Sequence, residues 1–297
     1  MNDLSRGSEP RHEIVVVTGA STGIGAATAR ELARRGFHVL AGVRRVTDAD
    51  ALRATNLEPI ALDITKEADV AAFLKQMTGN SERRPLRALV NNAGIGVNAP
   101  VEVLPLSEWR RLFDVNLFGH VAMIQALLPA LIESRGTVVN ISSIGGKVAM
   151  ATYGPYAGSK FALEAVSDAL RREVEPLGVK VVVIEPTAVK TGMLDGVAGI
   201  AERVTSGMTI GQRGRYAALM QAVVTQAQAA IPQAIPAEAA ARVVADAVTS
   251  KRPRARYTVG RNAATLVRLA RVLSDRMLDG LLVRNLKPYL IKSSVPT

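Results

Sequence analysis

The chain is expected to adopt an α/β fold, in which a parallel sheet of about seven strands is covered by helices on both faces. Short apolar runs alternate with helix-length amphipathic segments along most of the 297 residues, as is typical of consecutive strand–helix units. A hydrophobic content of 48 % argues against disorder, and a chain of this length can bury a large core. We therefore predict one doubly wound domain over residues 1–297.

Each expected strand is a short run rich in Val, Ile and Leu, bounded by Gly, Pro or polar residues. These runs lie at 13–19, 38–43, 59–64, 87–94, 136–143, 179–186 and 255–259. Between them, apolar residues recur at helical spacing, which predicts helices that pack one face on the sheet. These helical segments lie near 24–36, 66–77, 108–133, 156–177 and 236–249.

The alternation stops after Pro186. Residues 187–232 contain many small residues and no clear strand, which predicts a helical lid over a substrate site. From about 263 to 297 the chain forms a basic tail, and leucines interleaved with arginines predict a helix over 263–286. Such a helix could lie on a membrane surface, or could pack its leucines on the domain or on another subunit.

The net charge of +11 is concentrated at the C-terminal end, where residues 251–297 hold eleven Lys and Arg against two acids. This favours an anionic partner, although a solvated basic surface has the same composition. Cysteine is absent, residues 1–12 lack an apolar signal core, and no apolar run reaches about 18 residues. We expect a cytoplasmic protein without a membrane span, associated with membranes only if the tail binds lipid.

The segment "TGASTGIG" at 18–25 lies between the first expected strand and the first expected helix. Gly19, Gly23 and Gly25 would let the backbone turn tightly and approach a pyrophosphate, to which the helix N-terminus offers N–H donors. This placement predicts a Rossmann-type dinucleotide site. The alternative is a glycine-rich turn without a ligand.

The end of the second strand indicates which dinucleotide. An acid usually accepts the ribose 2′-hydroxyl of NAD at this position, but here Val43 is followed by Arg44 and Arg45. Because cations bind a 2′-phosphate and an acid repels it, NADP(H) is favoured over NAD(H). The alternative is two ordinary surface arginines.

"YAGSK" places Tyr156 and Lys160 four residues apart, on one face of a helix. A free phenol has a pKa near 10, and a neighbouring ammonium lowers it toward the range of a useful acid or base. Ser143, at the end of the fifth strand, could hydrogen-bond the same substrate oxygen. The three residues predict proton transfer to or from an alcohol oxygen. His12, His38 and His120 are widely spaced, so no metal site is expected.

In order and spacing, "TGASTGIG", "NNAG" (91–94), "DVN" (114–116), "ISS" (141–143) and "YAGSK" resemble the short-chain dehydrogenase/reductase family. The resemblance implies that Tyr156 transfers the proton while Lys160 lowers the Tyr156 pKa and binds the nicotinamide ribose. Ser143 would orient the substrate oxygen, and Asn116 would hold a water in a proton relay.

The resemblance also implies a set of cofactor contacts, with Asp63 at the adenine and Thr191 at the carboxamide. The matching positions are Gly19, Ser21, Thr22, Gly23, Ile24, Gly25, Arg44, Arg45, Asp63, Ile64, Asn91, Ala93, Gly94, Tyr156, Lys160, Pro186, Val189 and Thr191. One position departs from the family, because Thr187 follows Pro186 where glycine is usual. A side chain there could shift the nicotinamide pocket or the entry to the lid.

Residues 156–191 and 250–263 are similar to the retinol and hydroxysteroid dehydrogenase branch, which implies a lipophilic alcohol, ketone or aldehyde. Apolar lid residues agree with an apolar substrate, although they could equally be core packing. Val148, Tyr153 and Met193 are the expected substrate-lining residues. The family resemblance also implies a homodimer or homotetramer through the helices near 108–133 and 156–177.

Two other functions fit parts of the pattern. A non-catalytic dinucleotide sensor or scaffold would need the glycine loop alone, whereas this chain has all four catalytic positions as well. A sugar-nucleotide epimerase or dehydratase would have a different glycine spacing and a longer substrate domain. Nucleic-acid binding is not expected, because only the basic tail suggests it and aromatic residues make up 4 % of the chain.

Overall fold

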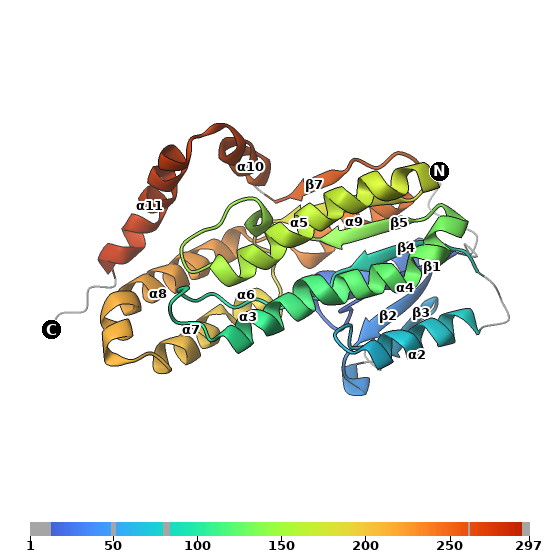
Figure 1. The fold of residues 1–297 in the computed structure, drawn as a ribbon, viewed down its shortest axis with the longest axis horizontal. Coiled ribbons are helices and arrows are strands. Elements are labelled where there is room, and N and C mark those ends of the chain that lie inside the picture. The colour runs from blue at the N-terminus through green and yellow to red at the C-terminus, as the bar shows by residue number, and fades with distance from the viewer. Residues whose placement is uncertain (1–12, 49–51, 80–83, 261, 293–297) are drawn as a thin grey trace, which may run out of the picture.

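A computed structural model describes residues 13–48, 52–79, 84–260 and 262–292, and residues 1–12 with His12 lie outside this part. The described chain folds around a seven-stranded parallel sheet in the order β3-β2-β1-β4-β5-β6-β7 (Figure 1). This confirms the predicted fold class. The strands are β1 Ile14–Val17, β2 His38–Val43, β3 Leu57–Ala61, β4 Leu86–Asn91, β5 Thr137–Ile141, β6 Lys180–Pro186 and β7 Arg256–Val259.

Two apolar layers hold the sheet between helices, because neighbouring residues of a buried strand point to opposite faces. On one face, α1 (Gly23–Arg34) and α9 (Ala237–Thr249) pack on each other and on residues such as Val15 and Val17. On the other face lie α2 (Glu67–Thr78), α4 (Gly119–Ser134) and α5 (Gly154–Val174), which cover Val16 and Leu89.

The helix expected at 108–133 is interrupted. α3 (Leu106–Phe113) passes into a π-helical turn, Asp114–Phe118, before α4 continues. Leu106–Ser134 is long and apolar enough to cross a membrane by length and composition, which the sequence reading did not anticipate. Its α4 portion contributes Met123, Leu127 and Leu131 to the core, as the core helix of a globular domain does.

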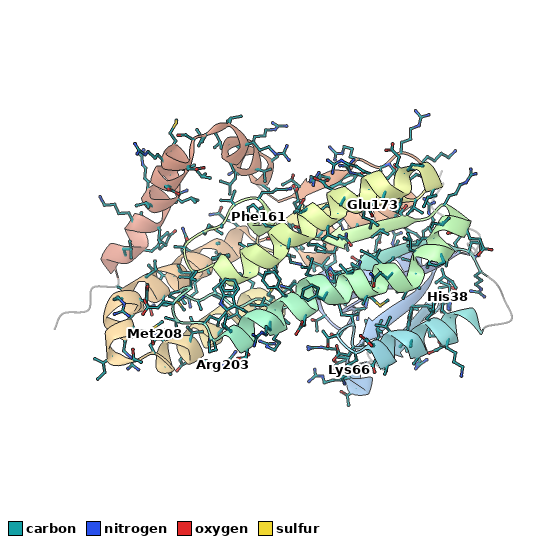
Figure 2. The ribbon with its side chains drawn as sticks, in the orientation of Figure 1. His38, Lys66, Phe161, Glu173, Arg203 and Met208 are labelled. Atoms are coloured by element: carbon teal, nitrogen blue, oxygen red, sulfur yellow. The ribbon has the colours of Figure 1, made fainter. Side chains whose placement is uncertain are left out.

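The predicted lid is helical, as expected, and lies at the end of the molecule opposite His38 (Figure 2). It consists of α6 (Gly192–Asp195), α7 (Val197–Ser206) and α8 (Ile210–Ala230). α8 begins with a capping box, in which Thr209 and Gln212 bond reciprocally. Glu102, in the loop before α3, accepts hydrogen bonds from Arg215 and from the Tyr216 hydroxyl, so the lid is held to the body.

The tail forms two helices rather than one. α10 (Ala263–Val272) ends at Leu273, whose backbone is extended, and α11 (Asp275–Lys292) begins beyond Ser274. α11 packs against α8 (Figure 1). The α11 residues Leu278, Leu281, Leu282 and Leu286 are half-buried, whereas Arg276, Arg284 and Lys287 are exposed. Residues 293–297 of the predicted tail lie outside the described part.

Candidate active site

The glycine loop joins β1 to the N-terminus of α1. Gly19 and Gly23 have φ angles of 61° and 58°, which favour glycine, and a Cβ on Gly19 would lie 2.6 Å from Ala93 Cα. α1 has no side-chain cap and no acid in its first turn, and Thr22 at its N-cap is exposed. The first N–H groups of α1 are therefore available to an anion, so this loop fits a pyrophosphate.

Thr18 and Asn92 fix this loop to the end of β4. The Thr18 hydroxyl accepts hydrogen bonds from the backbone N–H groups of Asn92 and Ala93, at 3.0 and 3.1 Å. The Asn92 amide donates to the carbonyls of Thr18 and Gly19, at 3.0 Å each. The sequence reading assigned no role to these two side chains, although both stand inside its motifs.

Asn91 lies in the core rather than facing the loop. Its side chain is fully buried and donates to Asn140 on β5 at 3.0 Å, and Asn140 donates to Ser167 on α5 at 2.8 Å. The Asn91 side chain therefore ties β4 to β5 and α5. The Ile64 side chain is also buried, against Gly119 on α4, which leaves the backbone at these two positions to meet a cofactor.

The two arginines after β2 differ in their surroundings. Arg45 forms a bidentate pair with Asp48, at 3.0 and 3.1 Å, whereas Arg44 is exposed and acts on Asp63. Burial raises the pKa of Asp63, but hydrogen bonds from Thr65, together with Lys66 and Arg44, hold it below its usual value. Arg44 therefore lies at the predicted adenosine end of the site, and Arg45 is occupied by its own turn.

The remaining cofactor positions gather around the same loop. Thr191, the N-cap of α6, lies against Gly23, where a Cβ would be 2.9 Å from Thr191 Cγ2. Ser21 and Ile24 are half-buried in the loop and in α1, Pro186 ends β6, and Val189 forms a bridge with Ile235. These contacts bring the end of β6 to the glycine loop, as a dinucleotide spanning both would require.

Ser143 and Tyr156 meet beyond the end of β5. Ser143 caps the short turn Ile144–Gly146, where its oxygen accepts from the Gly145 N–H at 3.0 Å. A Cβ on Gly145 would lie 3.4 Å from Ser143 Oγ and 3.2 Å from Tyr156 Cε1, so the two side chains flank the same position. Burial raises the pKa of Tyr156, the neighbouring Ser143 hydroxyl opposes this, and nearby Tyr153 adds to the rise. The phenol is therefore protonated at neutral pH and can donate a proton.

Lys160 is buried behind Tyr156. Only 4 % of it is exposed, its Nζ donates to the Ile141 carbonyl at 2.9 Å, and Nζ lies 6.0 Å from the centre of the Tyr156 ring. Burial lowers the pKa of Lys160 to about 8. Burial raises the pKa of Tyr156, and the expected lowering of that pKa by Lys160 stays a prediction.

Asn116 lies in the π-helical turn between α3 and α4, a type of turn that often occurs at functional sites. Its amide holds both backbone groups of Ile95, at 2.9 Å each, and donates to Ser159 on α5 at 3.0 Å. A Cβ on Gly94 would lie 3.4 Å from Asn116 Oδ1 and 3.8 Å from Lys160 Nζ. Asn116, Gly94 and Lys160 are therefore brought together, and the proton relay through Asn116 stays a prediction.

Apolar side chains surround the Tyr156 ring. Tyr156 packs on a cluster that includes Val97 and Leu112, together with Ile200 from the lid. Met193 is 44 % exposed, and its sulfur lies 3.5 Å from the position that a Cβ on Gly96 would take. The Tyr156 ring lies 3.9 Å from the same position. The residues of the predicted lid thus contribute apolar surface next to the Tyr156 ring.

The other two expected substrate-lining residues differ in exposure. Tyr153 is half-buried and lies near Asn98, a residue to which the sequence motifs gave no role. Burial raises the pKa of Tyr153. Val148 is almost fully buried, with 3 % of its surface exposed.

Thr187 points toward β7. Its hydroxyl donates to the Val259 carbonyl at 3.3 Å, and its Cβ would be 3.0 Å from a Cβ on Gly260. Gly260 has a φ of 121° and leaves the space that Thr187 fills. The side chain therefore takes up room at the β6–β7 junction, which accounts for threonine at a position where glycine is usual.

The fold and these residues define a nicotinamide-dinucleotide oxidoreductase site, and comparison with known proteins identifies the family. Residues 13–199 match the family described as short chain dehydrogenase, and the chain belongs to it. A short-chain dehydrogenase from Streptomyces avermitilis has a solved structure that matches over 100 % of both chains, with a TM-score of 0.72 and 25 % identity.

Two relatives are named after different substrates. The NADPH-dependent 3-dehydrocapnine reductase of Ornithobacterium rhinotracheale is 32 % identical over 280 residues, covering 92 % of this chain and 96 % of that protein. Retinol dehydrogenase 7 of Mus musculus is 41 % identical over 192 residues, covering 63 % of this chain and 60 % of that protein. The chain is thus an NAD(P)-dependent oxidoreductase.

Proposed function

We propose that the chain interconverts an apolar alcohol and its ketone or aldehyde, with Tyr156 transferring the proton at the oxygen. The observation that carries this proposal is the Tyr156 side chain, which lies with the Ser143 hydroxyl around the Gly145 position and packs in an apolar cluster completed by the lid. Bound NADP(H) would supply or accept the hydride at the carbon. Because burial raises the pKa of Tyr156, the phenol carries its proton at neutral pH.

Each catalytic side chain has a separate part in this proposal. Ser143 directs its hydroxyl at the oxygen shared with Tyr156. Lys160 places a buried cation near the phenol, where it would favour the phenolate left after proton donation. Asn116 holds Ile95 and Ser159 in place around them, so that a substrate oxygen meets a fixed site.

NADP(H) is the proposed cofactor. Arg44 is exposed at the adenosine end and no acid ends β2, so a 2′-phosphate would meet a cation there. The name of the relative from Ornithobacterium rhinotracheale, which includes NADPH, supports the same choice. The loop and helix N-terminus described above would hold the pyrophosphate.

A lipophilic substrate is supported by the apolar cluster at Tyr156 and by the exposed thioether of Met193 on the lid. The name of another relative, retinol dehydrogenase 7, also indicates a lipophilic alcohol as its substrate. We therefore propose a retinoid, steroid or long-chain lipid carbonyl as the substrate class.

The test is a screen of all-trans-retinal, a 3-ketosteroid and a long-chain 2-ketone with NADPH and NADH in parallel. Tyr156→Phe should lower kcat by about 100- to 10,000-fold while leaving NADPH binding intact, because it removes only the proton that is transferred. Tyr153→Phe is the matched control, and it should change kcat by no more than a few-fold. A Tyr156→Phe variant near the wild-type rate would overturn the mechanism.

The alternative, a non-catalytic dinucleotide sensor, predicts a different outcome from the same screen. Such a protein would bind NADPH tightly, turn over no carbonyl of the panel and be unaffected by Tyr156→Phe. The placement of Ser143 and Tyr156 around the same Gly145 position favours the enzyme, because a sensor needs no oriented phenol.

We also propose that the exposed face of α11 contacts an anionic membrane surface. Arg276, Arg284 and Lys287 recur on this face, with Met277 and Val283 exposed beside them. Flotation with vesicles of phosphatidylserine and phosphatidylcholine should carry the protein upward at low salt, whereas phosphatidylcholine alone should not. Equal flotation with both would contradict the proposal. Assembly into a homodimer or homotetramer stays a prediction.

A further inference from the structure

A cluster of buried charges lies one helical turn beyond Lys160. Glu164 on α5 and Glu185 on β6 are only 4 % and 1 % exposed. Two cations reach them from other elements: Lys147 Nζ lies 2.6 Å from Glu164, and Arg256 Nε lies 3.0 Å from the same oxygen. Both cations also approach Glu185, at 3.7 and 3.4 Å. Burying such charges costs desolvation free energy, so we ask what their position beside the candidate active site does for the reaction.

The cluster holds the turn that carries Ser143. Lys147 directly follows Ile144–Gly146, the turn that Ser143 caps, and its ammonium binds Glu164 on the helix below. The turn also packs closely on that helix, since a Cβ on Gly146 would lie 3.1 Å from Glu164 Cγ and from the Lys160 carbonyl. The Lys147–Glu164 pair therefore fixes the distance between Ser143 and α5.

The same carboxylate is the acid that acts on Lys160. Tyr156, His120 and Glu164 are the titratable groups around this ammonium in the described chain. Tyr156 is protonated, and burial lowers the pKa of His120 to about 3, so that both are uncharged at neutral pH. Burial lowers the pKa of Lys160 to about 8, and Glu164 acts in the opposite direction.

We propose that Glu164 is a positioning residue for the reaction: through Lys147 it holds the Ser143 turn against α5, and its carboxylate is the counter-charge that keeps the buried Lys160 ammonium charged. This inference rests on the proposed roles of Ser143 and Lys160. Lys147 and Arg256 in turn form ion pairs with the Glu164 carboxylate.

The two members of the pair should move the pH profile in opposite directions. Glu164→Gln removes the carboxylate that acts on Lys160 and leaves Glu185 and Asp168 as the carboxylates that face Lys147 and Arg256, so Lys160 should lose its proton at lower pH. The alkaline limb of kcat/KM should then move down by about one pH unit. Lys147→Met removes a cation that offsets the charge of Glu164, so the alkaline limb of kcat/KM should move to higher pH. Both variants should lower kcat several-fold, because the Ser143 turn is released.

Asp168→Asn is the matched control. Asp168 also binds Arg256, at 2.9 Å, but it lies one turn farther along α5 and is half-buried. The alkaline limb of kcat/KM in this variant should therefore match that of the wild type. Folding of each variant is checked by circular dichroism. If Glu164→Gln does not fold, the upward shift in Lys147→Met still decides the question.

The experiment separates failure of this inference from failure of the proposed function. The profile is measured with the panel carbonyl that the wild type reduces fastest, and the pH dependence of NADPH affinity is measured in parallel by fluorescence. The affinity profile needs no substrate, so it tests Glu164 even if no carbonyl is reduced. Folded Glu164→Gln and Lys147→Met variants with wild-type limbs in both profiles would overturn the inference.

Discussion

Replacing Gly260 by alanine tests how the end of β6 meets β7. Gly260 has a φ of 121°, which an L residue rarely adopts, and the new Cβ would overlap the Thr187 hydroxyl. The backbone strain should cost about 1–3 kcal/mol, and the overlap about 1–3 kcal/mol more. At roughly 2 °C per kcal/mol for a chain of this size, Tm should fall by about 4–12 °C.

The two contributions are separable in a double-mutant cycle. Thr187→Gly alone loses the 3.3 Å hydroxyl bond to Val259, worth about 0.5–1.5 kcal/mol. In Thr187→Gly/Gly260→Ala the strain persists but the overlap is gone. The double variant should therefore be about 1–3 kcal/mol more stable than the sum of the single changes predicts.

The assay is urea unfolding with thermal melting as a second measurement. Gly199→Ala is the control, because Gly199 lies inside α7 with open space around its Cβ position, and it should be neutral or slightly stabilising. Strict additivity in the cycle would show that Gly260 is needed for its φ angle alone. A Gly260→Ala variant that melts with the wild type would refute the whole argument.

Three other predictions follow from particular contacts. Arg44→Ser should weaken NADPH binding about 10- to 100-fold with little effect on NADH binding. Arg45→Ser should change the binding of either cofactor little, because Arg45 is paired with Asp48. Fluorescence titration measures both affinities, and equal losses of NADPH affinity in the two variants would contradict the assignment. His120 should make the free energy of unfolding decrease as the pH is lowered from about 6.5 to 3. Burial lowers the pKa of His120 in the folded chain to about 3, so over this range the unfolded chain binds a proton that the folded chain does not. In urea titrations His120→Gln should lack that part of the slope, and parallel curves would exclude it. Glu102→Gln should weaken the attachment of α8 to the body, raising KM and speeding proteolysis near residues 207–214. Glu108→Gln breaks a hydrogen-bonded pair with Arg111 within α3 and acts on the lid only through the distant charge of Arg203, so it should do neither.

Features set by neighbours along the chain were predictable. The strand–helix alternation predicted the sheet, because its period and its glycine punctuation are properties of short segments. The glycine loop and the Tyr156–Lys160 spacing were found for the same reason. The break of the tail at Leu273 and the π-helical turn at Asn116 were missed, since neither has a strong local signal.

The amino-acid sequence by itself determined the class of fold, the glycine loop and the spacing of Ser143, Tyr156 and Lys160. The tertiary structure alone decided what surrounds them, because pKa values and packing depend on residues far apart in the chain. It placed Thr187 against Gly260 rather than in the pocket, and bound Lys147 and Arg256 to Glu164. It also decided the surroundings of Tyr156, since burial of the phenol, which raises its pKa, comes from residues that the local spacing does not reveal.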